Sequence, residues 1–339
     1  PLIVIFPFII SDLNEAMSTK DQLLLYLKEK KGNWVSGEAL STQLAVSRTA
    51  IWKHICKLRE EGYGIESSPK KGYLLRTISD LLLPNEIREG LDTNVFGRKD
   101  IVYYSKISST NTKAKELAAG DAPEGTLVVA EQQVKGRGRK GRTWFSPSQG
   151  GIYISLILKP PISPGEAPKI TMLTGVVVAE TLLKLTPCKI NIKWPNDILV
   201  NGKKLAGILT EMSTEMDAID YIVVGLGMNV STLGFPDDIK DKATSILIET
   251  GKYFPRVTFI REYLRWYEKY YEIFKNIGFE PVIQRWKELT NTIGQMVIAE
   301  VAGKKYIGEV HDIDNDGILI LKDESEKLHR IFSGDVTLI

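Results

Sequence analysis

The sequence predicts an α+β protein in three parts, and three patterns along the chain lead to this prediction. Residues 17–78 contain short helical patterns followed by a hairpin pattern. Residues 79–290 carry apolar strands interspersed with long helices, which is typical of a mixed β-sheet with flanking helices. Residues 291–339 contain short alternating strands separated by glycines, which is typical of a small β-barrel.

Composition places the chain among globular proteins and excludes several classes. Of its 339 residues, 43% are hydrophobic and 25% are charged. The net charge of +2 means that any nucleic-acid surface must be a local patch. The two cysteines, Cys56 and Cys188, lie far apart without metal-ligand spacing, so we expect no disulfide framework and no protein metal site. A reducing, cytoplasmic location agrees with this pattern.

Residues 1–16 do not resemble the rest of the chain. Their first ten residues are nearly all apolar, but a membrane-spanning helix needs about 20 residues. They also lack the basic start and small-residue cleavage site of a signal peptide. We expect an upstream extension or disordered tail here, a fold that begins at Met17, and no membrane association.

The pattern of residues 17–78 predicts a winged helix-turn-helix. Apolar residues recur at helical spacing over residues 21–31, and Ser36 and Ser47 are positioned to cap two further helices. Residues 65–75 read as a hairpin with two lysines near its tip. The helix after Ser47 is expected to enter the major groove of DNA while the hairpin reaches phosphates.

A charged helix face can also be a merely solvated surface, and Trp52 on the same helix either packs inward or touches DNA. Taken together, the short second helix, the basic third helix and the basic hairpin favour DNA binding. The DNA-binding residues that we predict are Ser47, Arg48, Thr49, Lys53, His54, Lys70 and Lys71.

A linker with one short helix is expected over residues 76–99. A strand over 101–104 then leads to a turn at Ser109, Thr110 and Asn111, which opens a helix. Side chains at such a turn either cap the helix or bind a ligand. A further strand over 126–131 delivers Gln133 to the next loop.

That loop, residues 136–144, is the most informative stretch and is called the Gly-Arg loop below. It reads Gly-Arg-Gly-Arg-Lys-Gly-Arg-Thr-Trp. Glycine allows close approach of the backbone to a ligand, and arginine matches carboxylate and phosphate oxygens. The loop therefore predicts a cradle for a phosphate or acyl phosphate, although it could be only a flexible basic loop. We expect it to be mobile until an anion binds, because its charges repel one another and little apolar surface holds it.

Strands and helices of the central part follow. Residues 151–158 form an apolar strand, and residues 168–185 and 256–276 form long helices, the second with an aromatic stripe that we assign to the core. A strand over 221–224 is expected to run into a turn containing Gly225 and Gly227, which either relieve crowding or allow a ligand to approach.

Two further motifs flank the strongest turn signal of the chain, Asn201-Gly202. Lys193-Trp194-Pro195-Asn196-Asp197 precedes it and Lys204 follows it. No covalent nucleophile or metal motif accompanies these residues. Such a set is suited to activating a carboxylate with a nucleotide, where catalysis consists of positioning and charge neutralisation.

Four motifs in order carry a resemblance to a known family. They are the Gly-Arg loop, Lys-Trp-Pro-Asn-Asp at 193–197, Lys-Leu-Ala-Gly-Ile-Leu at 204–209 and Gly-x-Gly-x-Asn at 225–229. Over residues 20–339 the chain resembles the BirA family of bacterial bifunctional biotin–protein ligases and biotin operon repressors. The resemblance implies a class II synthetase-like central sheet and an SH3-like C-terminal barrel.

The resemblance also implies an activity and its partners. Biotin and ATP with Mg²⁺ form biotinyl-5′-AMP, and the biotin is then transferred to a lysine of the biotin carboxyl carrier protein of acetyl-CoA carboxylase. The adenylate-bound protein dimerises and binds operator DNA. No tightly bound prosthetic group is expected.

Site residues follow from the resemblance motif by motif. Lys204, Arg137 and Arg139 are the expected catalytic residues. Asn196 and Asp197 position either the metal–phosphate assembly or Lys204, unless they form only a turn. The expected biotin-binding residues are Ser109, Thr110, Asn111, Gln133, Arg137, Gly138, Arg139 and Lys204, and the expected nucleotide-binding residues are Arg142, Trp144, Asn196, Asp197 and Asn229.

Two other functions stay open at this point. A transcription regulator could sense a small carboxylate without catalysis, but Lys204 and the complete Gly-Arg loop argue against it. A lipoate–protein ligase would share the fold, but the Gly-Arg-Gly-Arg and Lys-Trp-Pro-Asn-Asp motifs favour biotin.

Overall fold

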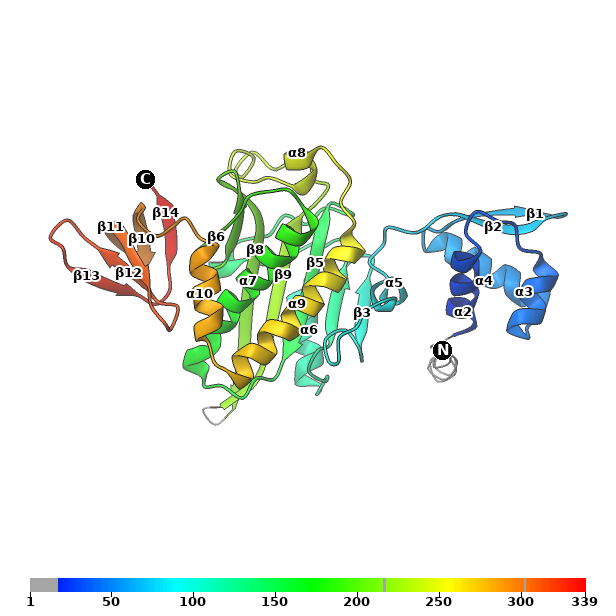
Figure 1. Cartoon of the computed structure of the whole chain (residues 1–339), viewed down its shortest axis with the longest axis horizontal. Helices are drawn as coiled ribbons and strands as arrows, with labels where there is room; N and C mark the ends of the chain where they lie inside the picture. Colours follow the sequence, from blue (N-terminus) through cyan, green and yellow to red (C-terminus); the bar gives the residue numbers. More distant parts are fainter. Residues whose placement is uncertain (1–17, 216–217, 302) are drawn as a thin grey trace, which may run out of the picture. The chain divides into compact units, whose positions relative to one another are not determined.

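The computed structural model describes residues 18–215, 218–301 and 303–339 (Figure 1). These residues fall into two compact units, one ending at Leu81 and the other running from Leu82 to Ile339. The extension predicted for residues 1–16 lies outside the described residues. The predicted division of the second unit at residue 290 stays a prediction.

The first unit is the winged helix-turn-helix that the sequence predicts. Its elements are the helices α2 (Thr19–Glu29), α3 (Gly37–Leu44) and α4 (Arg48–Glu60) and the antiparallel strands β1 (Gly64–Ser68) and β2 (Gly72–Thr77).

Serine caps and an apolar core explain why these helices form. The hydroxyl oxygens of Ser36 and Ser47 accept hydrogen bonds from the backbone N–H groups of Ala39 and Ala50, at 3.0 and 3.2 Å. Between the helices lies a core of fully buried side chains, namely Leu23, Leu27, Leu40, Ile51, Ile55 and Leu58.

The second unit contains a seven-stranded mixed sheet in the order β3-β4-β5-β9-β8-β7-β6 (Figure 1). Strands β3 and β4 are parallel, and every other neighbouring pair is antiparallel. The strands are β3 (Ile101–Tyr104), β4 (Leu127–Ala130), β5 (Gly151–Leu158), β6 (Ile190–Lys193), β7 (Asp197–Val200), β8 (Lys203–Glu215) and β9 (Ala218–Asn229).

Helices cover both faces of this sheet. Val128, Ile157 and Val223 pack against helix α6, whereas their neighbours in the strands join the main core with α7 and α9. Successive strand residues point to opposite faces, so α6 lies on one side and α7 and α9 lie on the other. The helices of this unit are α5 (Pro84–Arg88), α6 (Thr110–Ala119), α7 (Ala167–Leu185), α8 (Ile246–Thr250), α9 (Arg256–Asn276) and α10 (Glu280–Glu288).

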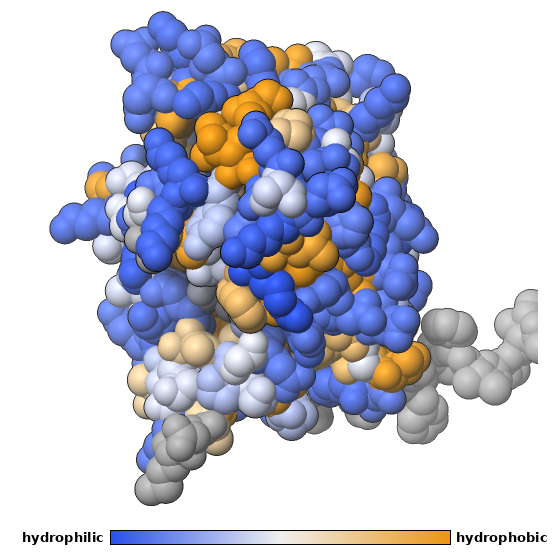
Figure 2. Space-filling view, turned by 90° about the vertical axis from the view of Figure 1, so that its left-hand side faces the viewer, coloured by the Kyte–Doolittle hydropathy of each residue, from blue (hydrophilic) through white to orange (hydrophobic). Residues whose placement is uncertain are grey.

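The C-terminal strands form a five-stranded antiparallel sheet in the order β13-β12-β11-β10-β14. Figure 2 looks at the molecule from this side and shows a mainly hydrophilic face with separate hydrophobic patches. Exposed apolar residues of the sheet and its flanking segments include Ile307, Leu328 and Phe332. The strands are β10 (Met296–Val301), β11 (Lys304–Ile313), β12 (Leu319–Lys322), β13 (Leu328–Ile331) and β14 (Asp335–Leu338).

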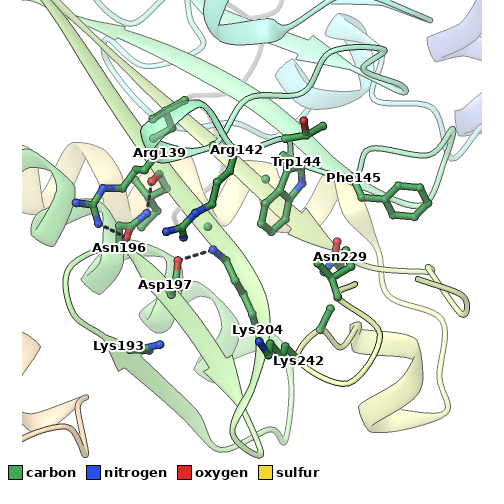
Figure 3. Close-up of a pocket in the computed structure, with 18 of the residues that line it drawn as sticks. Arg139, Arg142, Trp144, Phe145, Lys193, Asn196, Asp197, Lys204, Asn229 and Lys242 are labelled. Atoms are coloured by element: carbon green, nitrogen blue, oxygen red, sulfur yellow. Dashed lines mark hydrogen bonds and ion pairs between the residues drawn. The ribbon is translucent and has the colours of Figure 1, made fainter. Parts of the chain in front are cut away.

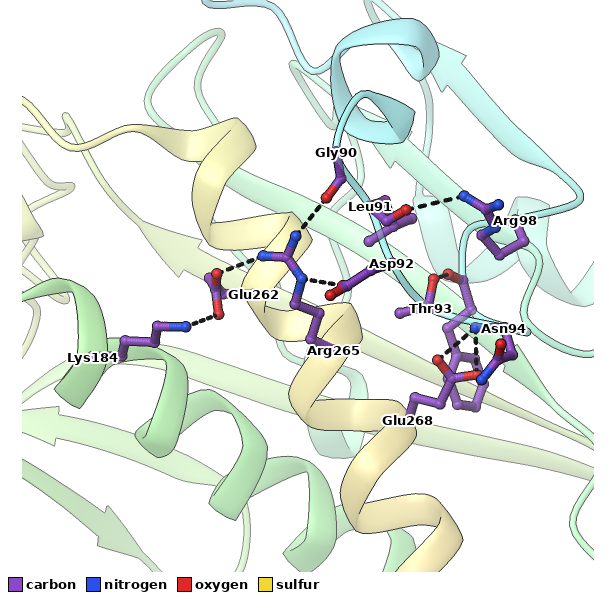
Figure 4. Close-up of polar contacts among 11 residues, drawn as sticks. Gly90, Leu91, Asp92, Thr93, Asn94, Arg98, Lys184, Glu262, Arg265 and Glu268 are labelled. Atoms are coloured by element: carbon purple, nitrogen blue, oxygen red, sulfur yellow. Dashed lines mark hydrogen bonds and ion pairs between the residues drawn. The ribbon is translucent and has the colours of Figure 1, made fainter. Parts of the chain in front are cut away.

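The prediction of a linker over residues 76–99 was wrong for its second half, which belongs to the second unit. Figure 4 shows this segment fastened to helix α9. Arg265 pairs with Asp92 and donates to the carbonyl oxygen of Gly90 at 2.5 Å. The Glu268 carboxylate accepts the N–H groups of Asn94 and Val95, each at 2.8 Å. These contacts join the segment to a helix distant in sequence.

A buried ion pair fixes the start of the same segment. Arg256 and Glu131 are 1% and 2% exposed, and their side chains meet at 2.9 Å. Glu131 also accepts the N–H of Leu82 at 2.7 Å, and Arg256 donates to the carbonyl oxygen of Gly151 at 3.1 Å. These hydrogen bonds offset the desolvation of both charges, because a buried charge without partners is strongly unfavourable.

Three glycines also lie inside strands, where the sequence predicted turns or strand ends. Strand β9 continues to Asn229, so Gly225 and Gly227 lie inside a strand rather than in a turn. Gly308 likewise lies within β11, where an added Cβ atom would come 2.2 Å from the carbonyl oxygen of Lys322.

Within the described part of the chain, no helix is both long and apolar enough to cross a membrane.

Candidate functional site

A single cavity of roughly 740 Å³ in the second unit brings the predicted ligase residues together. Its walls come from the start of α6, the Gly-Arg loop, the strands β7, β8 and β9, and the segment that precedes α8 (Figure 3). All thirteen predicted substrate and catalytic residues line it: Ser109, Thr110, Asn111, Gln133, Arg137, Gly138, Arg139, Arg142, Trp144, Asn196, Asp197, Lys204 and Asn229.

Gln133 and the start of α6 form one polar end of the cavity. The amide oxygen of Gln133 accepts the backbone N–H and the hydroxyl of Thr110, at 2.9 and 3.1 Å. It therefore takes the capping role at this helix, while the side chain of Ser109 makes no capping hydrogen bond. All three turn residues are buried in the cavity wall.

Ser155 is a site residue that the sequence reasoning missed. It is fully buried in β5, and its hydroxyl lies 2.8 Å from Thr110 Oγ1 and 2.6 Å from Asn111 Oδ1. Asn111 Nδ2 in turn donates to the carbonyl oxygen of Leu209 and to Glu211, at 3.2 and 3.1 Å. One polar residue inside an apolar strand was the signal that could have revealed it, since a buried hydroxyl needs a partner.

Gly225 and Gly227 make room for side chains of the site. A Cβ atom at Gly225 would lie 2.0 Å from Asn111 Oδ1, and one at Gly227 would lie 2.5 Å from Trp144 Nε1. Of the two explanations left open by the sequence, the structure favours relief of crowding. The crowding groups are themselves predicted ligand-binding residues, so the glycines set the position of both.

Cations of the Gly-Arg loop have polar partners, which the expectation of mutual repulsion and little apolar contact did not include. Arg137 lies 3.2 Å from Glu211. Arg139 donates to Asn196 Oδ1 at 3.0 Å and to the carbonyl oxygen of Gly334 at 3.2 Å. Lys140 and Arg142 both pair with Asp335 of strand β14. Carboxylates and carbonyls distant in sequence thus reduce the repulsion between the loop charges, which the loop sequence alone could not reveal.

Electrostatic shifts accompany these contacts. Burial lowers the pKa of the Arg139 guanidinium. Burial raises the pKa of Asp335, but its contacts with Lys140 and Arg142 lower it by more, so the net shift of this pKa is downward. Asp335 is therefore a carboxylate held in its charged form beside the loop.

Lys204 lies at the centre of the cavity (Figure 3). Its ammonium is 2.6 Å from Asp197 Oδ1, an ion pair whose angle departs from that of a good hydrogen bond. The same ammonium lies 5.4 Å from the ring centre of Trp144, within the range of a cation–π contact. The indole Nε1 of Trp144 is buried without a hydrogen-bond partner among the described residues.

Asn196 and Asn229 use their amide groups within the protein. Asn196 Nδ2 donates to the carbonyl oxygen of Ile208 at 2.8 Å, and Asn229 Nδ2 donates to that of Thr244 at 3.0 Å. Asn196 also lies in the turn between β6 and β7, as the alternative interpretation proposed. Both amide groups therefore stabilise the cavity wall through hydrogen bonds within the protein.

Other lining residues were given no role from the sequence, among them Lys193, Phe235, Lys242 and Asp335. Within the described ranges, no three His, Cys, Asp or Glu residues are grouped so as to hold a metal ion.

The first unit presents most of the predicted DNA-binding residues to solvent. Ser47, Arg48, Thr49, Lys53, Lys70 and Lys71 are exposed. His54 was wrongly placed on the exposed face, because it is half-buried and its Nδ1 atom is inside the unit. Trp52 is 55% exposed, so this residue does not serve as core.

Comparison with known proteins agrees with this description of both units. The model of the biotin/lipoate A/B protein ligase family matches residues 103–229, that of an HTH domain matches residues 19–74, and that of the biotin protein ligase C-terminal domain matches residues 292–338. Fold and site thus define a ligase of the biotin/lipoate class that is joined to a DNA-binding domain.

Whole-chain relatives make the assignment more specific. The bifunctional ligase/repressor BirA of Bacillus subtilis is 40% identical over 324 residues, which cover 95% of this chain and 99% of that protein. BirA of Escherichia coli is 34% identical over 297 residues, covering 86% and 89%. The biotin protein ligase of Aquifex aeolicus in complex with biotin and ATP has a TM-score of 0.62 at 29% identity, covering 71% of this chain and 99% of that one. The chain belongs to the BirA family of bifunctional ligase/repressors, and it is a biotin–protein ligase and repressor.

Replacement of Gly225 by alanine tests the crowding in the cavity wall. Gly225→Ala must displace Asn111, and overpacking of this kind typically lowers the free energy of unfolding by about 1–3 kcal/mol. Chemical denaturation of the two proteins measures the difference. Gly234→Ala is the control, since a Cβ atom there meets nothing within 4 Å. Equal stability of Gly225→Ala and wild type would contradict the claim that Gly225 makes room for Asn111.

Proposed function

We propose that the central cavity forms biotinyl-5′-AMP from biotin and ATP with Mg²⁺, and then transfers biotin to a lysine of the biotin carboxyl carrier protein of acetyl-CoA carboxylase. One observation carries the proposal. Thirteen residues from sequence segments up to 120 positions apart line the same cavity, with Lys204 and the Gly-Arg loop at its centre. The relative from Aquifex aeolicus, whose structure holds biotin and ATP, supports the choice of substrates.

Biotin binds at the end of the cavity formed by α6 and β5 in this proposal. Its ring system needs hydrogen-bond donors and acceptors in a dry, fixed setting. Ser109, Thr110, Asn111 and Gln133 are such groups, and the hydroxyl of Ser155 fixes two of them in place. We therefore assign these five residues to recognition of the biotin rings.

The carboxylate of biotin extends toward the Gly-Arg loop and Lys204. An attacking carboxylate and a nucleotide phosphate are both anionic, so their approach requires neutralisation. Arg137 and Arg139 supply positive charge on one side, with the backbone of Gly138 between them, and Lys204 supplies an ammonium on the other. Asp197 pairs with the Lys204 ammonium at 2.6 Å and holds it in position.

The nucleotide occupies the remaining part of the cavity. Trp144 offers an apolar ring for the adenine, and Asn229 supports the wall beside it through the carbonyl oxygen of Thr244. Arg142 and the turn at Asn196 and Asp197 border the phosphates. Mg²⁺ accompanies ATP as its phosphate complex, which is the usual mode of binding for this ion.

A mixed anhydride hydrolyses in water, so the intermediate needs a cover. The Gly-Arg loop can supply it, because its Trp144 ring already lies against Gly227 of β9. Glu211 and Asp335 hold the loop cations before ligand binds. A bound acyl phosphate would compete with these carboxylates for the same cations and so reorganise the loop.

Repression is assigned to the first unit acting on operator DNA. The exposed lysines of the wing suit phosphate contacts, and α4 suits the major groove. We propose that formation of the adenylate promotes a homodimer whose two winged helices bind two half-sites. The BirA relatives, which are named as repressors, support this role.

Lys204→Ala should reduce adenylation by about 10²-fold or more, the typical effect of losing one preorganised electrostatic contact. Biotin-dependent exchange of pyrophosphate into ATP measures this step. The neighbouring exposed residue provides the control variant Lys203→Ala, which should exchange at the wild-type rate. Unaltered exchange by Lys204→Ala would count against the assigned role.

Arg137→Ala should loosen the hold on the intermediate. The loss of one charge-assisted hydrogen bond predicts release of biotinyl-AMP about tenfold to hundredfold faster. Stopped-flow displacement of the bound adenylate measures the rate. Lys135→Ala removes an exposed charge just before the loop and should leave the rate unchanged. A wild-type release rate in Arg137→Ala would show that Arg137 does not contact the intermediate.

Removal of the two wing lysines should weaken DNA binding and its dependence on salt. If Lys70 and Lys71 each contact a phosphate, the double alanine variant lowers the slope of log K against log salt by about 2. Titration of operator duplex at several salt concentrations measures the slope, and adenylation by the same variant should be normal. An unchanged slope would remove the wing from the DNA interface.

A further inference from the structure

The roles proposed above do not use all of the positively charged side chains that line the central cavity. Its lining includes six cationic side chains: Arg137, Arg139, Arg142, Lys193, Lys204 and Lys242. Four of them have polar partners: Arg137 pairs with Glu211, Arg139 with Asn196, Arg142 with Asp335, and Lys204 with Asp197. Within the described part of the chain, the side chains of Lys193 and Lys242 make no hydrogen bond or ion pair, and neither residue entered the proposed mechanism.

Of these two, Lys193 is the more unusual. Lys242 is exposed, so water solvates its charge. Lys193 is partly buried at the end of β6, and burial is the main cause of a lowered pKa for its ammonium. A partly desolvated ammonium without a counterion is unfavourable, and an anionic ligand is the simplest way to stabilise it.

The nearest acid cannot fill this role alone. Lys193 pairs with Asp197 across the β6–β7 ladder, but the Asp197 carboxylate is already 2.6 Å from the Lys204 ammonium. In the view of Figure 3, Lys193 and Lys242 lie on one side of the Lys204–Asp197 pair, and Arg139 and Trp144 lie on the other. The two lysines without partners thus extend the cationic lining beyond the region assigned to the acyl group and the α-phosphate.

We propose that Lys193 binds the β- and γ-phosphates of the nucleotide and holds pyrophosphate as it leaves. This inference rests on the proposed function, because it adds a second cation to the phosphates that Arg142 is proposed to border. A triphosphate carries most of its charge beyond the α-phosphate, where Arg137, Arg139 and Lys204 are not assigned. Lys193 is a flexible point charge that suits a phosphate of variable position.

The chemical step balances without a proton transfer. A carboxylate oxygen of biotin forms a bond to the α-phosphorus, and the bond from that phosphorus to the oxygen bridging to the β-phosphate breaks. The electron pair of the broken bond leaves with pyrophosphate. Negative charge therefore grows on the oxygen that departs, and a cation beside it stabilises the transition state more than the ground state.

Steady-state kinetics of three variants of the full chain test this role. Lys193→Ala should raise both the KM for ATP and the inhibition constant for pyrophosphate by about tenfold to hundredfold, the effect of one charge-assisted contact. The KM for biotin should stay within twofold of the wild-type value. Lys193→Arg keeps the charge and should recover most of the loss, and Lys189→Ala removes an exposed lysine just before the same strand and should behave as wild type.

Each contrary result has a separate meaning. Unchanged KM for ATP and unchanged inhibition by pyrophosphate in Lys193→Ala would overturn the inference. Equal losses for biotin and ATP that Lys193→Arg does not recover would also overturn it, since they indicate a role in folding the β6–β7 turn. A wild-type protein that forms no biotinyl-AMP would refute the proposed function itself, and this inference with it.

Discussion

The ion pair between Lys204 and Asp197 is the interaction on which the rest of the site depends. It places an ammonium in the middle of the cavity, 2.6 Å from a carboxylate on the neighbouring strand and beneath the ring of Trp144. Every other cation of the cavity lies around this pair. Because like charges repel strongly in a partly buried setting, the cluster exists only where carboxylates or carbonyls separate its members. Asp197, Glu211 and Asp335 provide that separation, and each comes from a different strand.

The central sheet explains how these charges meet. Strands β7, β8 and β9 are neighbours, so Asp197, Lys204 and Gly227 lie close together although the chain separates them. Gly225 and Gly227 in β9 let the side chains of Asn111 and Trp144 lie directly against the sheet. A rigid scaffold of this kind holds reacting groups in place, while the Gly-Arg loop above it retains alternative partners for its cations. The site thus combines a fixed floor with a cover whose contacts are ionic.

The sequence predicted the secondary-structure elements and the residues of the site better than it predicted the contacts among those residues. Helices and strands followed from periodicity, and all thirteen residues predicted from the motifs are among those that line the cavity. Partners distant in sequence were missed: Asp335 is 193 residues from Arg142, and Ser155 is 45 residues from Thr110. The segment near residues 90–95 was predicted to be part of a linker, but its partners lie on α9, more than 170 residues further along. Pairing across such separations depends on tertiary structure, which local patterns do not encode.

The central claim is that this cavity makes an acyl adenylate from biotin. The most direct test is to mix the purified chain with biotin, ATP and Mg²⁺ in a single turnover, and to identify the bound product by mass spectrometry while pyrophosphate is measured. The account predicts biotinyl-AMP and pyrophosphate in equal amounts, with neither formed when biotin is omitted. Pyrophosphate release without biotin, or an adenylate formed only when lipoate replaces biotin, would contradict it.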